Sequence, residues 1–363
     1  MKKSVCLILI LVLVLGTCLG ASAFSFKFWK KKNQPASVEQ IAQVQDFEIL
    51  PTMNTKSNAK NQVWVGTFQL VWNDLIDELL KQPVEFVGYK SVMAENLNKK
   101  SFSADELSEN SYYKTWGLVS PQMKDKITNG IKEKFNETSD LLGGVDWTPA
   151  PRKYILYAML KKDFEYIEKF AKLADGYFNG SEGEVKYFGL NRDSSSQVRS
   201  SIRVLFYNNS DDYAITLKSK QGDIVYLYRT NDDKTLDEYY TDVKTKSTNF
   251  KGKKFLTPKD DFKAPMIDFK AERQFPELCN KLIKNTDYIL SQAIETIQFK
   301  MNEAGVKLKS EAIIVMKATS CLGPVEEPRY FYFNDKYVVF IEEEGKKPYY
   351  AMKITDVKRL QQT

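Results

Sequence analysis

The chain has 363 residues, of which 43% are hydrophobic and 28% are charged, and its formal net charge is +6. This length suits one large domain or two ordinary ones, and the interspersed charges predict solubility rather than nucleic-acid binding. The sequence contains no histidine, which excludes Ser-His-Asp and Cys-His catalysis and histidine-containing zinc sites. Catalysis is not excluded by this absence, but its commonest groups are missing. We expect a protein that is not an enzyme and that binds no cofactor, metal or nucleic acid.

The N-terminus has the features of a secretory signal peptide. Lys2 and Lys3 precede an unbroken apolar run from Val5 to Leu15, and Ala21-Ser22-Ala23 offers a cleavage site. We interpret residues 1–23 as a cleaved signal peptide and the protein as secreted and extracytoplasmic. An uncleaved membrane anchor stays open, because Ser4 to Phe24 approaches the roughly 20 residues that span a bilayer. Membrane contact is expected only in that case.

The rest of the chain predicts a single α+β domain over residues 63–363, after a polar, weakly periodic tether over residues 24–62. Apolar spacing or helix-end signals predict helices at 67–81, 124–142, 236–243 and 276–284, and residues 154–174 combine a strand-like start with a helical or irregular stretch. Strands are predicted at 185–190, 202–207, 213–218, 223–229, 264–269, 295–301, 329–343 and 348–354. Helices dominate the first half and strands the second, without a Pro/Gly-rich linker between them.

Several segments, taken in order, resemble landmarks of the serpin family. They are the helix and stop of Lys124 to Leu142, the central strand Tyr154 to Phe164, the three strands of Val204 to Arg229, the strand and helix of Ala264 to Lys270 and Phe275 to Leu278, the hinge Met301 to Gly305, and the closing strand Tyr332 to Phe340. Two departures stand out. Tyr157 replaces the family's usual Asn, and no histidine is present for the polar cluster beneath the opening sheet.

This resemblance implies large mixed β-sheets, helices packed on one end, and an exposed reactive-centre-type loop over residues 306–328. In inhibitory serpins a protease cleaves this loop, which then inserts into the central sheet and traps the acyl-enzyme. The implied protein is a monomeric endopeptidase inhibitor that acts as a suicide substrate on a serine or cysteine protease. The alternative is a non-inhibitory serpin-fold binding or scaffold protein that has no protease trap.

The same resemblance assigns the site residues. The family's usual loop length, counted from Gly305, places the scissile bond at Thr319-Ser320, with Lys317 as an alternative recognition residue. The hinge residues are Glu303, Gly305, Val306, Leu308, Ser310 and Ala312. Alternate residues from Val306 onward would point inward, which suits a half-buried strand, although Val306 and Leu308 are bulkier than the small residues of inhibitory hinges. The alternative is that Ala318 to Glu326 is only a connecting loop.

Other chemical motifs have simpler explanations. Ser111-Tyr112-Tyr113-Lys114 matches the Ser-x-x-Lys pattern of penicillin-recognising enzymes, but no Lys-Thr-Gly follows, so we interpret it as a solvated turn. The aspartate pairs at 211–212 and 232–233 offer too few ligands for a calcium-binding loop, and we interpret them as turn residues. The aromatic runs at 330–333 and 349–350 predict core and edge packing. Cys279 and Cys321 are interpreted as unbridged, since the resemblance places them at opposite poles of the sheet.

Overall fold

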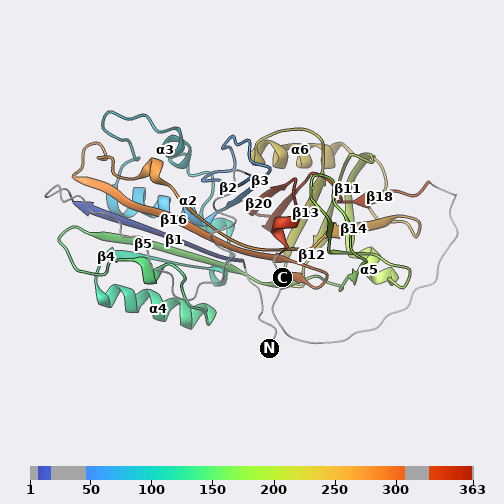
Figure 1. Ribbon diagram of the computed structural model, residues 1–363, viewed down its shortest axis with the longest axis horizontal. Coiled ribbons are helices and arrows are strands. Elements are labelled where there is room, and N and C mark those ends of the chain that lie inside the picture. The colour runs from blue at the N-terminus through green and yellow to red at the C-terminus, as the bar shows by residue number, and fades with distance from the viewer. Residues whose placement is uncertain (1–6, 18–45, 307–326, 362–363) are drawn as a thin grey trace.

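The computed structural model describes residues 7–17, of which only the backbone is considered, together with residues 46–306 and 327–361. Within these residues the strands form a five-stranded, a seven-stranded and a four-stranded sheet and two short strand pairs. Figure 1 shows an elongated molecule with the five-stranded sheet towards one end and the seven-stranded sheet towards the other. Helices and strands are both present, so the α+β fold expected from the sequence is confirmed.

The five-stranded sheet has the order β15-β16-β1-β5-β4, and every neighbouring pair is antiparallel. Its strands are β15 (Ile267–Gln274), β16 (Tyr288–Met301), β1 (Leu7–Thr17), β5 (Tyr154–Lys162) and β4 (Tyr112–Leu118). In Figure 1 the dark blue β1 lies between the green β5 and the orange β16. The middle strand of this sheet is therefore supplied by the N-terminal segment of the chain.

The two faces of the five-stranded sheet contribute to different hydrophobic clusters. Even-numbered residues of β5, from Leu156 to Leu160, belong to the main core, which also contains α2 (Thr67–Asp74). Odd-numbered residues, from Ile155 to Met159, pack against α4 (Pro121–Phe135). This division follows from the two-residue period of a strand. The buried residues of α4 are Met123, Ile127, Ile131 and Phe135, a spacing of four that forms one helical stripe.

The seven-stranded sheet has the order β11-β12-β13-β19-β20-β3-β2. Its strands are β11 (Ile202–Asn209), β12 (Asp212–Lys218), β13 (Asp223–Arg229), β19 (Tyr337–Glu343), β20 (Pro348–Ile354), β3 (Asn61–Val65) and β2 (Phe47–Ile49). The expected meander and the closing hairpin β19–β20 are both present. Helix α6 (Leu236–Asn249) begins with a capping box at Thr235 and Glu238 and contacts β11 and β20.

The remaining elements are short. The four-stranded sheet contains β18 (Tyr330–Tyr332), β14 (Asp261–Pro265), β10 (Tyr187–Gly189) and β7 (Ala171–Lys172). The strand pairs are β17 (Gly305–Val306) with β6 (Phe164–Glu165) and β8 (Gly176–Tyr177) with β9 (Glu184–Val185). The short helices are α3 (Val92–Leu97), α5 (Ser196–Ser200), the π-helical extension of α2 (Leu75–Leu80), and 3-10 turns at Ala104–Glu106, Glu109–Ser111, Leu142–Gly144, Pro276–Leu278 and Lys358–Leu360.

The expected boundary between tether and domain at residue 63 is wrong. Strand β2 pairs in parallel with β3, and Leu50 is fully buried in the main core, so the folded part already includes residues 46–62. Residues 24–45, the rest of the predicted tether, lie outside the described residues. The error arose because Phe47, Ile49 and Leu50 form an apolar group too short to show a clear period.

Three further predictions need correction. The helix expected at 276–284 is a single 3-10 turn, Pro276–Leu278, and the chain then passes through Asn280 with a φ of 57°. The stretch after β5, expected to be helical or irregular, contains the short strands β6 and β7. The helix expected at 124–142 exists but begins at Pro121 and ends at Phe135, because Asn136 takes the left-handed conformation (φ 52°).

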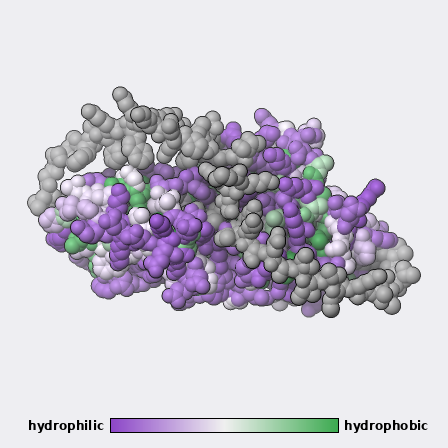
Figure 2. All heavy atoms as spheres, turned by 90° about the horizontal axis from the view of Figure 1, so that it is seen from below, coloured by the Kyte–Doolittle hydropathy of each residue, from purple (hydrophilic) through white to green (hydrophobic). Residues whose placement is uncertain are grey.

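Along the described part of the chain, no helix combines the length and apolar character needed to cross a bilayer. Figure 2 views the molecule from below, the side on which α4 lies in Figure 1. The coloured surface is mostly hydrophilic there, and its hydrophobic areas are small and separate. The apolar residues of α4 are accordingly directed into the molecule, against β5.

Candidate functional site

The candidate site is the position in the five-stranded sheet between β5 and β16, which we call the strand slot. In this structure β1 fills it. Residues Leu7 to Leu15 pair with β5 in unbroken register, from Leu7 opposite Lys162 to Leu15 opposite Tyr154. On the other side, Ile8 pairs with Gln298, and the register continues to Val14 before it shifts. The slot therefore accepts one extended, antiparallel strand with a partner on each side.

A turn at the end of β16 directs the chain to one end of the strand slot. We call Asn302 to Gly305 the hinge turn. The Asn302 N–H donates to the Gly305 carbonyl (3.2 Å), and the Gly305 N–H donates to the Asn302 carbonyl (3.3 Å). The Ala304 N–H donates to Asn302 Oδ1 (3.0 Å). The chain thereby reverses, and β17 pairs antiparallel with β6, with Gly305 opposite Glu165.

The hinge turn is held by the segment that follows β5. The Tyr166 N–H donates to the Ala304 carbonyl (3.1 Å), and the Phe170 N–H donates to the Glu303 carbonyl (2.9 Å). Glu303 is buried, with only 6% of the residue exposed. Its Oε1 atom lies 3.5 Å from Lys172 Nζ. These contacts fix the direction in which the chain leaves β16.

Residue 305 must be glycine for two independent reasons. Its φ is +129°, a conformation that residues with a side chain rarely adopt. A Cβ at this position would also lie 2.5 Å from the carbonyl oxygen of Phe164, well inside van der Waals contact. The glycine of the predicted hinge is thus required by the close approach of two backbone segments.

The hinge turn and the first residue of β1 lie at the same end of the strand slot. Val306 pairs with Phe164, and Leu7 pairs with Lys162, which is two residues before Phe164 in the chain. Both pairings are antiparallel, so the chain at Val306 runs in the direction that β1 follows along β5. The end of the described hinge therefore abuts the beginning of β1.

An ion cluster lies at this end of the slot and consists of the buried Lys162 and Asp223 and the half-buried Glu343. Lys162 Nζ is 2.5 Å from Glu343 Oε1 and 3.0 Å from Asp223 Oδ1, and it lies 5.2 Å from the ring centroid of Tyr349. The cluster links β5 to β13 and β19, and so joins the five-stranded sheet to the seven-stranded one.

The two carboxyl groups of the cluster differ in their pKa values. Burial tends to raise the pKa of Glu343, but hydrogen bonds from Lys162 and Ser108 outweigh it and lower this pKa to about 2. Burial raises the pKa of Asp223 above its usual range despite the opposing charge of Lys162. Lys162 therefore stabilises ionised Glu343 most strongly.

A third carboxyl group, that of Glu295, lies on the strand that borders the middle of the slot. Glu295 is fully buried on β16 and pairs with Leu11 of β1 and with Arg273 of β15. Neither of its carboxyl oxygens has a hydrogen-bond partner within the described part of the chain. Burial raises the pKa of Glu295 well above its usual range, although the charge of Arg273 and the backbone N–H of Phe68 both oppose the shift.

The sequence-predicted site residues divide into two groups. Glu303, Gly305 and Val306 are described, and the structure brings them together in the hinge turn and β17. Leu308, Ser310, Ala312, Lys317, Thr319 and Ser320 lie outside the described residues, so the loop, its scissile bond and its exposure stay predictions. Lys162, Asp223, Glu343 and Glu295 were missed, because isolated charges in strand-like runs resemble ordinary solvent-facing residues.

The solvated turn expected at Ser111 to Lys114 is wrong, because Ser111 is buried and Tyr112 begins β4. Ser111 Oγ lies 2.6 Å from Ser108 Oγ, whereas Lys114 forms an ion pair with Asp74, so the serine and lysine of the Ser-x-x-Lys pattern have separate partners. Phe331, Phe333, Tyr349 and Tyr350 are fully buried, which confirms the prediction of core packing. In the described ranges no three His, Cys, Asp or Glu side chains are grouped as a metal site.

The state of the cysteines is only partly described. Cys279 is half-buried, burial raises the pKa of its thiol, and its Sγ lies 3.4 Å from the Phe275 carbonyl oxygen. Cys321 lies outside the described residues, so the absence of a bridge between them stays a prediction.

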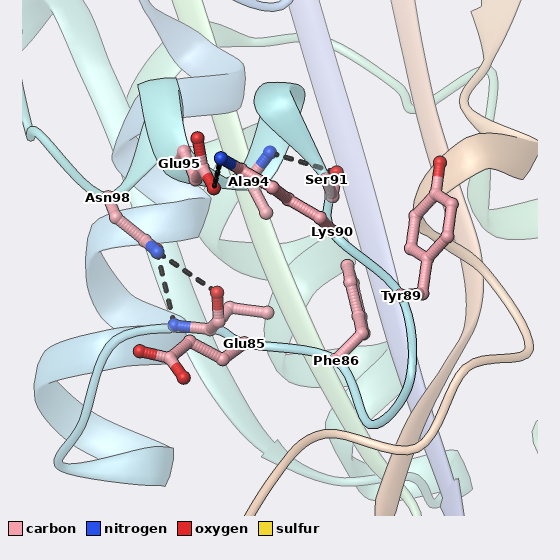
Figure 3. Close-up of a pocket in the computed structure, with 9 residues that line it drawn as sticks. Glu85, Phe86, Tyr89, Lys90, Ser91, Ala94, Glu95 and Asn98 are labelled. Carbon is pink, nitrogen blue, oxygen red and sulfur yellow. Dashed lines mark hydrogen bonds and ion pairs between the residues drawn. The ribbon is translucent and has the colours of Figure 1, made fainter.

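A hollow of about 320 Å³ lies between the segment of residues 84–91 and α3 (Figure 3). Its polar groups already serve the local fold. Asn98 donates to the Val84 carbonyl (2.9 Å), Ser91 caps α3 by accepting from the Ala94 N–H (3.2 Å), and Lys90 lies 3.7 Å from Glu95. We therefore place the candidate site at the strand slot.

Comparisons with known proteins find structural similarity only. No protein-family model matches the chain, and no curated protein matches it significantly. Similar solved structures include maspin, with 11% identity, a TM-score of 0.43, and coverage of 68% of this chain and 76% of maspin. For Serpin48, a serpin in the insect Tenebrio molitor, identity is 12%, the TM-score is 0.42, and coverage is 80% and 95%. For thyroxine-binding globulin in complex with thyroxine, the values are 11%, 0.45, 83% and 94%.

Serpin48 and the other solved structures named above are what this chain resembles in the path of its backbone. These similarities concern the path of the backbone, and they assign no function to any residue of this chain.

Proposed function

We propose that this protein is a secreted serpin-like endopeptidase inhibitor. A serine or cysteine protease would cleave the loop 306–328, which would then insert into the strand slot and act as a suicide substrate. The observation that carries the proposal is the geometry of the hinge turn. It delivers Val306 to the end of a slot that is one strand wide and is otherwise filled by a segment from the far end of the chain.

The registers of the paired strands support this path. If the pairing of Gly305 and Val306 continued along β5, Leu308 would come opposite Lys162 and Ala312 opposite Ala158. Directly opposed residues share one face of a sheet, and Ala158 faces the main core. The alternate residues expected to point inward would then enter that core, while Lys307, Lys309 and Glu311 would take the face covered by α4.

Removal of residues 1–23 belongs to the same proposal, because it would take β1 out of the strand slot. Secretion through a cleaved signal peptide would thus leave the slot free for the loop. The retained membrane anchor, considered above, would leave β1 attached to the chain.

The test is complex formation between the chain that begins at Phe24 and a panel of serine and cysteine proteases. We expect an SDS-resistant complex with at least one protease, and we expect Thr319→Pro to abolish it. Gly143→Ala is the matched control, because Gly143 has an ordinary φ and open space around it, so complex formation should persist. Clean cleavage of the loop by every protease, without a complex, would leave the non-inhibitory binding or scaffold protein as the better description.

A further inference from the structure

We propose that the strand slot is a binding site for the chain's own N-terminal segment, Leu7 to Thr17, and that this segment withholds the slot from the loop while it stays attached. The second part rests on the proposed function, whereas the first part does not. The occupant is assigned from strand pairing, and the exclusion follows from the position of the hinge turn.

The pairing of β1 is extensive on both sides. Each residue from Leu7 to Leu15 has a partner on β5, and each residue from Ile8 to Val14 has a partner on β16. An edge strand would use only one row of its backbone groups, whereas β1 uses both. The segment is thus bound by two ladders of backbone hydrogen bonds, the arrangement by which a sheet accepts an added strand.

The composition of the segment fits the slot on both faces. Its sequence is apolar at every position from Leu7 to Leu15. The residues opposite it on β5 belong alternately to the main core and to the α4 cluster, so both faces of the slot are apolar. A strand buried on both faces is expected to be a continuous apolar run. The loop meets this requirement less well, because Lys307, Lys309 and Glu311 would occupy the face covered by α4.

The slot has room for one strand, so its two occupants exclude each other. Val306 pairs with Phe164. Lys162, which a loop continuing from Val306 would reach two residues later, already pairs with Leu7. A loop that continued from Val306 along β5 would need the partners that Leu7 and the residues after it hold. Inhibitory competence would therefore begin only when the N-terminal segment is removed, which would keep the precursor inactive before export.

The test is a designed disulfide in the full chain, produced without export so that residues 1–23 stay attached. Leu11 lies directly opposite Ala158, a separation of about 4.5–5.5 Å between Cα atoms in antiparallel pairs, which a disulfide can bridge. The four native cysteines are replaced by serine, and Leu11→Cys is combined with Ala158→Cys. We expect nearly complete bridging on mild oxidation, measured by peptide mapping.

The control combines Leu11→Cys with Ala271→Cys. Ala271 is on β15, one strand beyond β16, and is two residues out of line with Leu11, so the two Cα atoms are separated by more than about 9 Å and should not bridge. Equal bridging in the two variants, or none in the Ala158 variant, would overturn the assignment of the occupant.

A second variant tests the assignment without a buried cysteine. Leu9→Asp with Leu13→Asp introduces two charged residues at positions paired with Leu160 and Leu156, which belong to the main core, and should expel the segment. We expect hydrogen exchange at the amides of residues 155–160 to be at least tenfold slower in the parent full chain than in this variant. Equal exchange would contradict the assignment.

The same two proteins separate the inference from the proposed function. We expect the parent full chain to form at least tenfold less SDS-resistant complex than the Asp variant. Equal amounts would overturn the exclusion. If the disulfide forms but neither the Asp variant nor the chain that begins at Phe24 traps any protease, the N-terminal strand stands and the proposed function falls.

Discussion

Gly305 and Phe164 approach so closely that a Cβ on residue 305 would lie 2.5 Å from the carbonyl oxygen of Phe164. This contact sets the hinge turn against the segment that follows β5. We expect Gly305→Ala to destabilise the protein by about 2–4 kcal/mol, because it combines an unfavourable φ with a backbone clash. Chemical denaturation at pH 7 measures the change.

Gly345→Ala is the matched control for that substitution. Gly345 also has a positive φ (+85°) but has open space around its would-be Cβ. Gly345→Ala should lower the free energy of unfolding only by the penalty for the positive φ, about 1 kcal/mol. An equal decrease in the free energy of unfolding in the two variants would show that the close contact with Phe164 does not contribute to the effect of Gly305→Ala.

Glu343→Gln should destabilise the protein in a pH-dependent way. The folded-state pKa of Glu343 is lowered to about 2, so its ionised form contributes stability above the unfolded pKa of about 4.5, and that contribution is lost as the pH falls towards 2. We expect a loss of about 1–3 kcal/mol at pH 7, because a hydrogen-bonded ionic partner of Lys162 is removed. The loss should shrink between pH 4.5 and pH 2. Urea denaturation across this range measures it, with the exposed Glu182→Gln as control.

Glu295→Gln should show the opposite pH dependence. The folded-state pKa of Glu295 is raised, so the ionised carboxyl costs stability as the pH rises above the unfolded pKa of about 4.5. With β1 in place, the variant should gain stability relative to the parent between pH 4.5 and pH 7, and the gain should vanish at pH 4. A constant difference across this range would contradict the burial of an unpaired carboxyl.

Much of the fold could be predicted from local patterns. The apolar runs of β19 and β20 predicted the closing hairpin, and turn residues at 208–212 and 220–223 marked the meander of β11, β12 and β13. The helix α4 was predicted within the longer segment 124–142, which Gly143-Gly144 was expected to end. These elements are determined by residues close in sequence, which is the information that a periodic pattern contains.

The strand slot could be predicted only in part. Gly305 was identified as a hinge residue, but the N-terminal run was interpreted as a signal peptide, because an apolar run fits a signal peptide, a membrane anchor and a strand buried on both faces equally well. Its partners on β5 and β16 are distant in sequence. Lys162, Asp223 and Glu343 were missed for the same reason, since only the packing of two sheets brings them together.

The most direct test of the strand slot as an acceptor for the loop is the melting temperature of the chain that begins at Phe24, before and after a protease nicks the loop 306–328. If the loop enters the slot, it gains two ladders of hydrogen bonds and a buried face, and we predict a rise of roughly 10 °C or more. The same nick in the full chain, where β1 fills the slot, should give no comparable rise. An unchanged melting temperature in the chain that begins at Phe24 would contradict loop insertion and the inhibitory mechanism with it.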